Sequence, residues 1–407
     1  MSGSFSVPKR LRPEIGAALE PRFRVGALVK LFDCQCCGQT LYFENTKCES
    51  CGHRLGYDPL ANDMLALERT DEELNQLAWH TANASKSRFR FCANAEHEVC
   101  NWLIPGDSAD IYCLACRHNK TVPDLSKAEN KELWRAMEFA KHRLFYTLLR
   151  LKLPLVTRAE DPNEGLVFEF KADESETVKT MTGHDHGDIT INIAEADDAE
   201  RERRRTSMHE PYRTLLGHFR HEIGHYYWDR LVRDAAALTP YREIFGDETE
   251  DYNEALQKHY RAGPPADRRE HFVSAYATTH SWEDFAETWA HYLHIVDTLE
   301  TAGAFGIKIR PKDIAGAEAL TTEVDFSPYT ADSIQPVVQA WVPLTFAVNS
   351  LNRSMGLRDL YPFVLTPTII EKLGFIHDLV HGWVGGERRA QPPIDTDEQK
   401  VPETSVA

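Results

Sequence analysis

The stretch that decides the fold is Leu215-Leu-Gly-His-Phe-Arg-His221-Glu222-Ile-Gly-His225-Tyr-Tyr-Trp. Apolar residues recur in it at three- and four-residue intervals, so we predict an amphipathic helix with Pro211 in its first turn, ending near residue 233. One helical turn separates His221 from His225, so both side chains project from one face and can share a metal ion. Glu222 lies between them, where a carboxylate can act as general base toward a water at the metal. This His-Glu-x-x-His pattern is typical of zinc hydrolases.

A zinc hydrolase also needs a third protein ligand and one coordination position left open for water. The metzincin type would need Gly at position 228 and His at position 231, but the chain has Trp228 and Leu231, which excludes that class. The remaining option is an acidic residue from a later helix. Three acids between the two helices, Asp247, Glu248 and Asp251, are the weaker candidates.

The stronger candidates lie between residues 276 and 294, where the pattern predicts a helix with Ser281 as its N-cap. Glu283, Glu287 and His291 are spaced by four and therefore share one face of this helix. The alternative interpretation is an acidic, solvated face. However, a helix so rich in aromatic residues, with two Glu and two His, is unusual for a plain amphipathic surface helix.

Tyr276-x6-Glu283-x-Phe-Ala-Glu287, coming after the His-Glu-x-x-His motif, resembles the gluzincin metallopeptidases and, among them, the lethal-factor-like branch. This resemblance implies that Glu283 is the third zinc ligand and that Tyr276 helps to stabilise the tetrahedral intermediate. It also implies that Glu287 accepts a hydrogen bond from a ligand histidine and fixes its tautomer. If the register differs, Glu287 is the ligand and Glu283 moves outward.

Upstream of the motif, residues 187–194 alternate as a β-strand does. By analogy with zincin folds, we expect an edge strand beside the active-site cleft, to which an extended peptide can add. His184 and His186 lie in the turn before this strand, and we interpret them as turn residues rather than ligands.

All nine cysteines precede position 117, and eight of them form two sets. The first set has two closely spaced Cys-x2-Cys knuckles, which predict a zinc ribbon: Cys34, Cys37, Cys48 and Cys51. Cys36 lies inside the first knuckle and is expected to be a free thiol.

The second set has only one knuckle and predicts a second zinc: Cys92, Cys100, Cys113 and Cys116. His97 could replace one thiolate there, and the alternative interpretation is a group of reduced core thiols. Four thiolates close the coordination shell, so both sites would be structural. The knuckles and the lack of a secretory signal favour metal in a reducing compartment over disulfides.

Composition limits the partners. The net charge of −17 disfavours nucleic acid and anionic lipid surfaces. No apolar run approaches the roughly 20 residues that span a bilayer, and the basic segment around Arg10 lacks the apolar core of a signal peptide. We therefore expect a cytoplasmic protein with no membrane partner. Tyr42, Phe43 and Tyr57, near the first ribbon, either contact a partner protein or pack the ribbon.

The predicted fold is α+β, in which an N-terminal region of zinc-ribbon modules precedes a mainly helical, zincin-like metallopeptidase domain with a small sheet. We expect a flexible N-terminus over residues 1–27, tandem zinc ribbons over 28–122, the metallopeptidase domain over 125–385 and a disordered tail over 387–407. A long helix over 125–153 would open the metallopeptidase domain, and residues 332–384 are predicted to be helical again.

The whole layout resembles a bacterial family of zinc-binding metallopeptidases with an N-terminal zinc ribbon. The similarity extends over nearly the whole chain and is carried by residues 37–45, by residues 213–225 and by Trp282-Glu-Asp. It implies two zinc modules and a gluzincin-like domain, but it implies no substrate.

The predicted function is hydrolysis of peptide or protein substrates with one catalytic zinc and one or two structural zincs. Two alternatives belong to other classes: a non-proteolytic, zinc-stabilised scaffold or regulator, and a hydrolase of a non-peptide amide. A general base such as Glu222 has no use in a purely structural site, which favours an enzyme.

Overall fold

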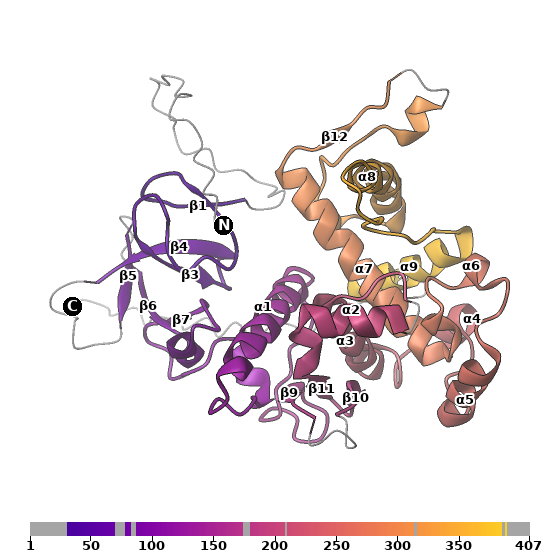
Figure 1. Cartoon of the computed structure of the whole chain (residues 1–407), viewed down its shortest axis with the longest axis horizontal. Helices are drawn as coiled ribbons and strands as arrows, with labels where there is room; N and C mark the ends of the chain where they lie inside the picture. The colour runs from indigo at the N-terminus through magenta and orange to yellow at the C-terminus, as the bar shows by residue number, and fades with distance from the viewer. Residues whose placement is uncertain are drawn as a thin grey trace, which may run out of the picture.

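The computed structural model describes residues 31–69, 78–82, 87–173, 180–207, 210–312, 316–384 and 387–388. The predicted flexible N-terminus, 1–27, lies outside the described residues, as does residue 389 and beyond in the predicted tail. The predicted α+β class is confirmed. Short strands make up the ribbon region, and a mainly helical half follows (Figure 1).

The ribbon region contains two antiparallel sheets. One pairs β1 (Phe32–Asp33) with β2 (Thr40–Leu41) around the first knuckle. The other has five strands in sequence order: β3 (Arg54–Asp58), β4 (Asp63–Glu68), β5 (Trp79–Thr81), β6 (Arg88–Phe91) and β7 (Leu103–Pro105). Four consecutive residues of β4 are buried, so both faces of this sheet are covered.

A third sheet has four strands in the order β10-β11-β9-β8. Its strands are β8 (Asn119–Thr121), β9 (Val167–Lys171), β10 (Gly183–Asp185) and β11 (Asp188–Asn192). The strand expected over 187–194 is β11, but the prediction that it forms the sheet edge was wrong. His186 and Gly187 both adopt positive φ, 45° and 84°, which permits a tight hairpin turn that places β10 on that edge.

The helices that the structure describes are α1 (Ala128–Arg150), α2 (Asp198–Ser207), α3 (Leu215–Leu231), α4 (Leu238–Phe245), α5 (Tyr252–Ala262), α6 (Arg268–His271), α7 (Ser281–Ala304), α8 (Ile334–Ser354) and α9 (Pro367–Val380). Short 3-10 turns are η2 (Ala93–His97), η3 (Cys116–His118), η4 (Ile193–Ala196), η5 (Tyr276–Thr278), η6 (Ala317–Leu320) and η7 (Pro328–Thr330). Two small hairpins complete the fold, β12 (Lys308–Ile309) with β13 (Thr322–Glu323), and β14 (Trp383–Val384) with β15 (Glu387–Arg388).

Two helix starts differ from the prediction. Thr214 caps α3, because its side-chain oxygen accepts a hydrogen bond from the Gly217 N–H at 3.0 Å, so Pro211 lies outside the helix. His280 caps α7, because its Nδ1 accepts from the Trp282 N–H at 3.1 Å, which makes Ser281 the first helical residue. The N-cap of α7 is therefore a histidine ring nitrogen, where the sequence predicted the hydroxyl of Ser281.

Helices α3 and α7 pack closely against each other, and α1 lies between the five-stranded sheet and the helical half (Figure 1). Gly224 permits the close approach: a Cβ there would lie 3.0 Å from the Ala286 Cα atom. One buried apolar cluster extends from Phe32 in the ribbon region to Ile376 in α9. The ribbons and the helical half therefore share a core.

Candidate metal centres

Three nitrogen and oxygen donors converge where α3 meets α7. His221 Nε2 and His225 Nε2 lie 3.2 Å apart, and Glu283 Oε2 lies 3.1 Å from the first and 3.4 Å from the second. The helical spacing of four brings the two histidines together, and the crossing of the helices adds the carboxylate. The sequence placed these three residues in one candidate site, and the structure brings them together.

This triangle has the size that a zinc ion requires. Zinc binds histidine nitrogen and carboxylate oxygen at about 2.0–2.1 Å, so the edge of a tetrahedral site is roughly 3.3 Å. The three observed separations, 3.1 to 3.4 Å, agree with that edge. With three protein donors, a fourth position remains for water or substrate, as in catalytic rather than structural zinc sites.

Two further side chains hold the donors in place. Glu287 Oε1 lies 2.7 Å from Nδ1 of His221, on the ring edge opposite the donor triangle. Tyr252, the first residue of α5, donates its hydroxyl proton to Glu283 Oε1 at 2.6 Å. Glu287 thus contacts the ligand histidine His221 from outside the donor triangle. The contact of Tyr252 with Glu283 was not predicted from the sequence.

Glu222 and Tyr276 flank the same centre. Glu222 is buried, with 8% of its surface exposed, directly after His221 in α3. Tyr276 opens the turn η5, is 36% exposed, and its ring lies 5.9 Å from the ring of His221. The indole ring of Trp282 covers His225 at 3.7 Å between centroids.

Burial and charge set the protonation of this group. Burial raises the pKa of Glu222 to about 7. Burial also opposes ionisation of Glu283, but His225 and His221 outweigh it and hold the pKa of that carboxyl well below its usual range. Against the same penalty, the hydrogen bond from His221 lowers the pKa of Glu287 to about 2. Glu283 and Glu287 are therefore anionic, whereas Glu222 can exchange a proton near neutral pH.

The weaker ligand candidates lie elsewhere. Asp247 accepts hydrogen bonds from Thr249, Glu248 pairs with Arg242, and Asp251 caps α5. Their carboxylates are used in local structure, because the insert folds as α4 and α5.

The two histidines of the β10–β11 hairpin also differ from each other. His186 is exposed in the turn, as predicted. The side chain of His184, in β10, is buried; its ring stacks at 6.2 Å on the ring of His225 and accepts a hydrogen bond from the Gly187 N–H. It supports a donor but lies outside the donor triangle.

The first cysteine set forms a compact group at the start of the described chain. Cys34 Sγ lies 3.5 Å from Cys51 Sγ, and Cys37 Sγ lies 3.6 Å from Cys48 Sγ. Zinc–sulfur bonds of about 2.3 Å give a tetrahedral edge of roughly 3.8 Å, so these separations fit one zinc ion. Cys36 is exposed beside this group.

The second cysteine set is fully buried. Cys92, Cys100, Cys113 and Cys116 place their sulfur atoms within 4.8 Å of one another, and the Cys100–Cys113 separation is 3.8 Å. His97, considered as a replacement ligand, is instead exposed and lies against the ring of Trp134.

Helix α1 supplies polar neighbours to this second set. His142 Nε2 lies 3.5 Å from Cys100 Sγ and 3.6 Å from Cys116 Sγ, and Glu138 Oε2 lies 3.6 Å from Cys116 Sγ. Lys141 pairs with Glu138 at 2.8 Å, and both side chains are completely buried. This group could not be predicted from the sequence, because the spacing of Glu138 and Lys141 is that of an ordinary exposed ion pair on a helix.

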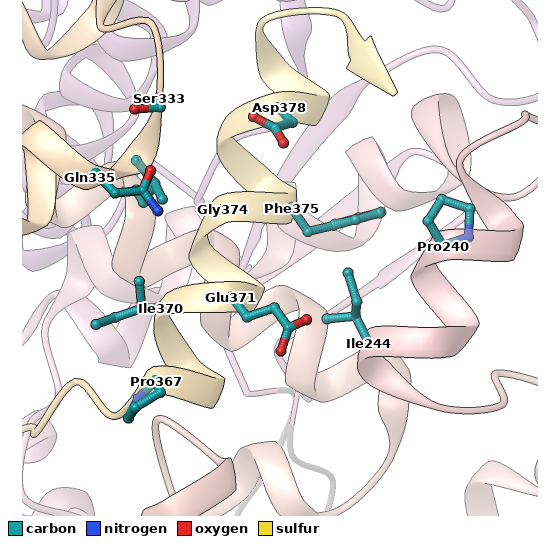
Figure 2. Close-up of a pocket in the computed structure, with 11 residues that line it drawn as sticks. Pro240, Ile244, Ser333, Gln335, Pro367, Ile370, Glu371, Gly374, Phe375 and Asp378 are labelled. Carbon is teal, nitrogen blue, oxygen red and sulfur yellow. The ribbon is translucent and has the colours of Figure 1, made fainter. Parts of the chain in front are cut away.

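Two open cavities lie away from the cysteine sets. One, of about 510 Å³, separates α4 from α8 and α9, with Glu371 and Asp378 on its α9 wall (Figure 2). The other, of about 730 Å³, lies between α5 and the segment that follows Tyr276. None of the helices in the described ranges is long and apolar enough to cross a membrane.

Comparison with known proteins follows this division of the chain. Residues 31–127 match a zinc-ribbon domain, and residues 130–379 match the family described as "Putative zinc-binding metallo-peptidase". Uncharacterized proteins of Mycobacterium tuberculosis and Mycobacterium bovis are 43% identical over 351 residues, which cover 86% of this chain and 94% of theirs. No solved structure matches. A family match over most of the chain, on the half that carries the donor triangle, shows that the protein belongs to this zinc-binding metallopeptidase family and bears an N-terminal zinc-ribbon domain.

Proposed function

We propose that the protein is a zinc-dependent peptidase whose catalytic metal is held by His221, His225 and Glu283. The observation that carries the proposal is the donor triangle of 3.1 to 3.4 Å with a buried glutamate, Glu222, in the same helix. A zinc ion bound there would polarise the scissile carbonyl and lower the pKa of a water molecule.

Glu222 is proposed as the general base and acid. Its carboxylate would accept a proton from the attacking water and then deliver that proton to the nitrogen of the leaving amine. Burial, which raises the pKa of Glu222 to about 7, supports both transfers near neutral pH. The phenol of Tyr276 would donate a hydrogen bond to the carbonyl oxygen as negative charge develops on it.

Positioning residues complete the proposal. Glu287 would keep the Nδ1 proton of His221 in place, so that Nε2 faces the metal. Tyr252 would hold Glu283 through its other oxygen. The edge strand β10, rather than β11, would be the strand to which an extended substrate adds.

The two cysteine sets are proposed as structural zinc sites, so that the protein binds three zinc ions. Glu138 already meets Lys141, Asn119 and Trp134, which supports a role beside the second zinc rather than as its ligand. His142 would donate its Nε2 proton toward the thiolates of Cys100 and Cys116.

The test combines zinc content with hydrolysis of a mixture of quenched-fluorescent peptides. We expect about three zinc ions in the wild type, two in His221→Ala/His225→Ala, and three in Glu222→Gln, which should lose hydrolysis. Glu243→Gln changes an exposed glutamate of α4 and serves as the control with full activity. Zinc content unaffected by the double substitution, or Glu222→Gln turning over peptides as fast as the control, would refute the mechanism.

A further inference from the structure

The two carboxylate oxygens of Glu283 lie in different surroundings. Oε2 faces His221 Nε2 at 3.1 Å and His225 Nε2 at 3.4 Å, and it is buried without a hydrogen-bond partner in the described part of the chain. Oε1 accepts the hydroxyl proton of Tyr252 at 2.6 Å. A phenol keeps its proton at neutral pH and an ionised carboxylate can only accept, so the direction of this hydrogen bond is fixed. One oxygen is therefore left for a metal, and the other is already engaged.

Tyr252 comes from the insert between the two donor helices. It is the first residue of α5, at the lower right of Figure 1, whereas Glu283 lies near the start of α7. Asp251 fixes the start of α5, because its Oδ1 accepts a hydrogen bond from the Glu254 N–H at 2.8 Å. The ring of Tyr252 packs edge-on against the ring of His280, with 5.5 Å between the centroids. The helix cap and the ring contact together hold the phenol in place.

His280 joins the starts of these two helices. Its Nδ1 accepts a hydrogen bond from the Trp282 N–H at 3.1 Å and so caps α7, three residues before Glu283. Since Nδ1 accepts, the proton of the neutral ring is on Nε2, which lies 3.1 Å from the carbonyl oxygen of Glu250, two residues before Tyr252. One imidazole ring therefore positions both partners of the hydrogen bond to the carboxylate.

We propose that Tyr252 is a positioning residue that limits Glu283 to binding the metal through Oε2 alone, and that His280 holds Tyr252 in place for this purpose. A carboxylate can bind a metal through one oxygen or through both. With Oε1 engaged by the phenol, the site has three protein donors, and a coordination position stays open for water. The inference rests on the proposed catalytic metal and adds how Glu283 binds it.

The test measures the coordination of cobalt, which accepts the same nitrogen and oxygen ligands as zinc and has an X-ray absorption edge of its own. A chelator removes exchangeable zinc, and one equivalent of Co²⁺ is added to concentrated protein, so that a lowered affinity does not leave the site empty. His221→Ala/His225→Ala, treated in the same way, supplies the background from any cobalt at the cysteine sets. In the wild type we expect one oxygen of Glu283 at about 2.0–2.2 Å from the metal. In Tyr252→Phe we expect both oxygens to bind and the carboxylate carbon to lie closer to the metal.

Two further variants separate the roles. His280→Asn keeps a side-chain oxygen of the kind preferred at helix N-caps, but it removes the ring nitrogen that contacts the Glu250 carbonyl. It should also bring the second oxygen of Glu283 to the metal, with unchanged hydrogen-exchange protection at the start of α7. The matched control is Tyr260→Phe, which changes an exposed phenol of the same helix and should keep the wild-type coordination.

The possible results are distinct. Equal metal–oxygen and metal–carbon distances in the wild type and Tyr252→Phe, or two bound oxygens of Glu283 in the wild type, would overturn the role of Tyr252. Wild-type coordination in His280→Asn would overturn the role of His280. If cobalt binds as expected but the wild type hydrolyses no peptide, the proposed peptidase activity fails, while the coordination of Glu283 still decides this inference. If His221→Ala/His225→Ala takes up as much cobalt as the wild type, both proposals fail.

Discussion

At the scale of single residues, the contact between Glu287 and His221 leads to a testable prediction. Glu287→Gln replaces an acceptor by a group that can also donate, so the Nδ1 proton of His221 loses its fixed partner. We expect the affinity of the site formed by His221, His225 and Glu283 for zinc to fall about 10- to 100-fold, as measured by competition with a chelator. Tyr252→Phe removes the hydrogen bond to Glu283 and should also lower the zinc affinity of this site. Unchanged affinity in Glu287→Gln would contradict the positioning role.

His377 of α9 makes a prediction about pH. Burial lowers the pKa of this histidine to about 4, and its Nδ1 lies 3.1 Å from the hydroxyl of Tyr292. Between pH 4 and 6.5 the unfolded chain therefore binds a proton at His377 that the folded chain does not, so stability rises with pH across this window. The contribution is at most about 3 kcal/mol.

The measurement is urea unfolding at several pH values between 4.5 and 7. His377→Gln, whose amide can still bond to Tyr292, should show a shallower rise of the unfolding free energy than the parent, with the difference accumulating as pH falls. Parallel curves for the two proteins would show that His377 does not contribute.

The sequence could predict those site residues that one helix brings together. His221 and His225 are one turn apart, as are Glu283 and Glu287, so local periodicity places each pair on a face. Tyr252 lies 31 positions before its partner, Glu283, and only the folding of the insert into α4 and α5 brings them together. The buried polar group beside the second cysteine set could not be predicted either: Glu138, Lys141 and His142. An i,i+3 charge pair is as common on an exposed helix as in a buried one.

At the scale of elements, the contact between α3 and α7 holds the donors in register. A Cβ at Gly224 would lie 3.0 Å from the Ala286 Cα atom and 3.2 Å from the Trp289 Cβ atom, so Gly224→Ala requires α7 to give way by a few tenths of an ångström. We expect a loss of about 1–3 kcal/mol in stability and weaker zinc binding, measured by urea unfolding and chelator competition.

A matched control comes from α9. At Gly374 a Cβ would meet Ile334 at an ordinary 3.5 Å, so Gly374→Ala should gain up to about 1 kcal/mol from helix propensity. If Gly224→Ala were as stable as Gly374→Ala, with unchanged zinc affinity, the close approach of the helices would not position the donors.

Element boundaries were harder to predict than elements. The helices around residues 215–231 and 281–304 follow from apolar periodicity, whereas their caps depend on Thr214 and His280, which compete with Pro211 and Ser281. The five-stranded sheet of the ribbon region went unpredicted, because β4 carries four consecutive buried apolar residues and shows no alternation.

At the scale of the whole molecule, the two halves are physically continuous. The strand β8, in the ribbon part of the sequence, pairs in parallel with β9 of the peptidase part. One apolar core crosses the same boundary, and Glu138 and His142 of α1 lie against the second cysteine set. The ribbon region therefore forms part of the support for the helices that carry the donor triangle, since α1 in turn packs against α3.

Because of this continuity, we expect substitutions in the two cysteine sets to affect stability and hydrogen exchange differently. Cys100→Ser/Cys113→Ser and Cys37→Ser/Cys51→Ser should each lose one zinc ion. Only the first change empties the buried site beside His142, so it should cost about 4 kcal/mol or more and lower hydrogen-exchange protection along α1 and α3. Cys37 and Cys51 are exposed, so their loss should loosen mainly β1 and β2. Equal loss of protection in α3 for both variants would contradict a supporting role specific to the second site.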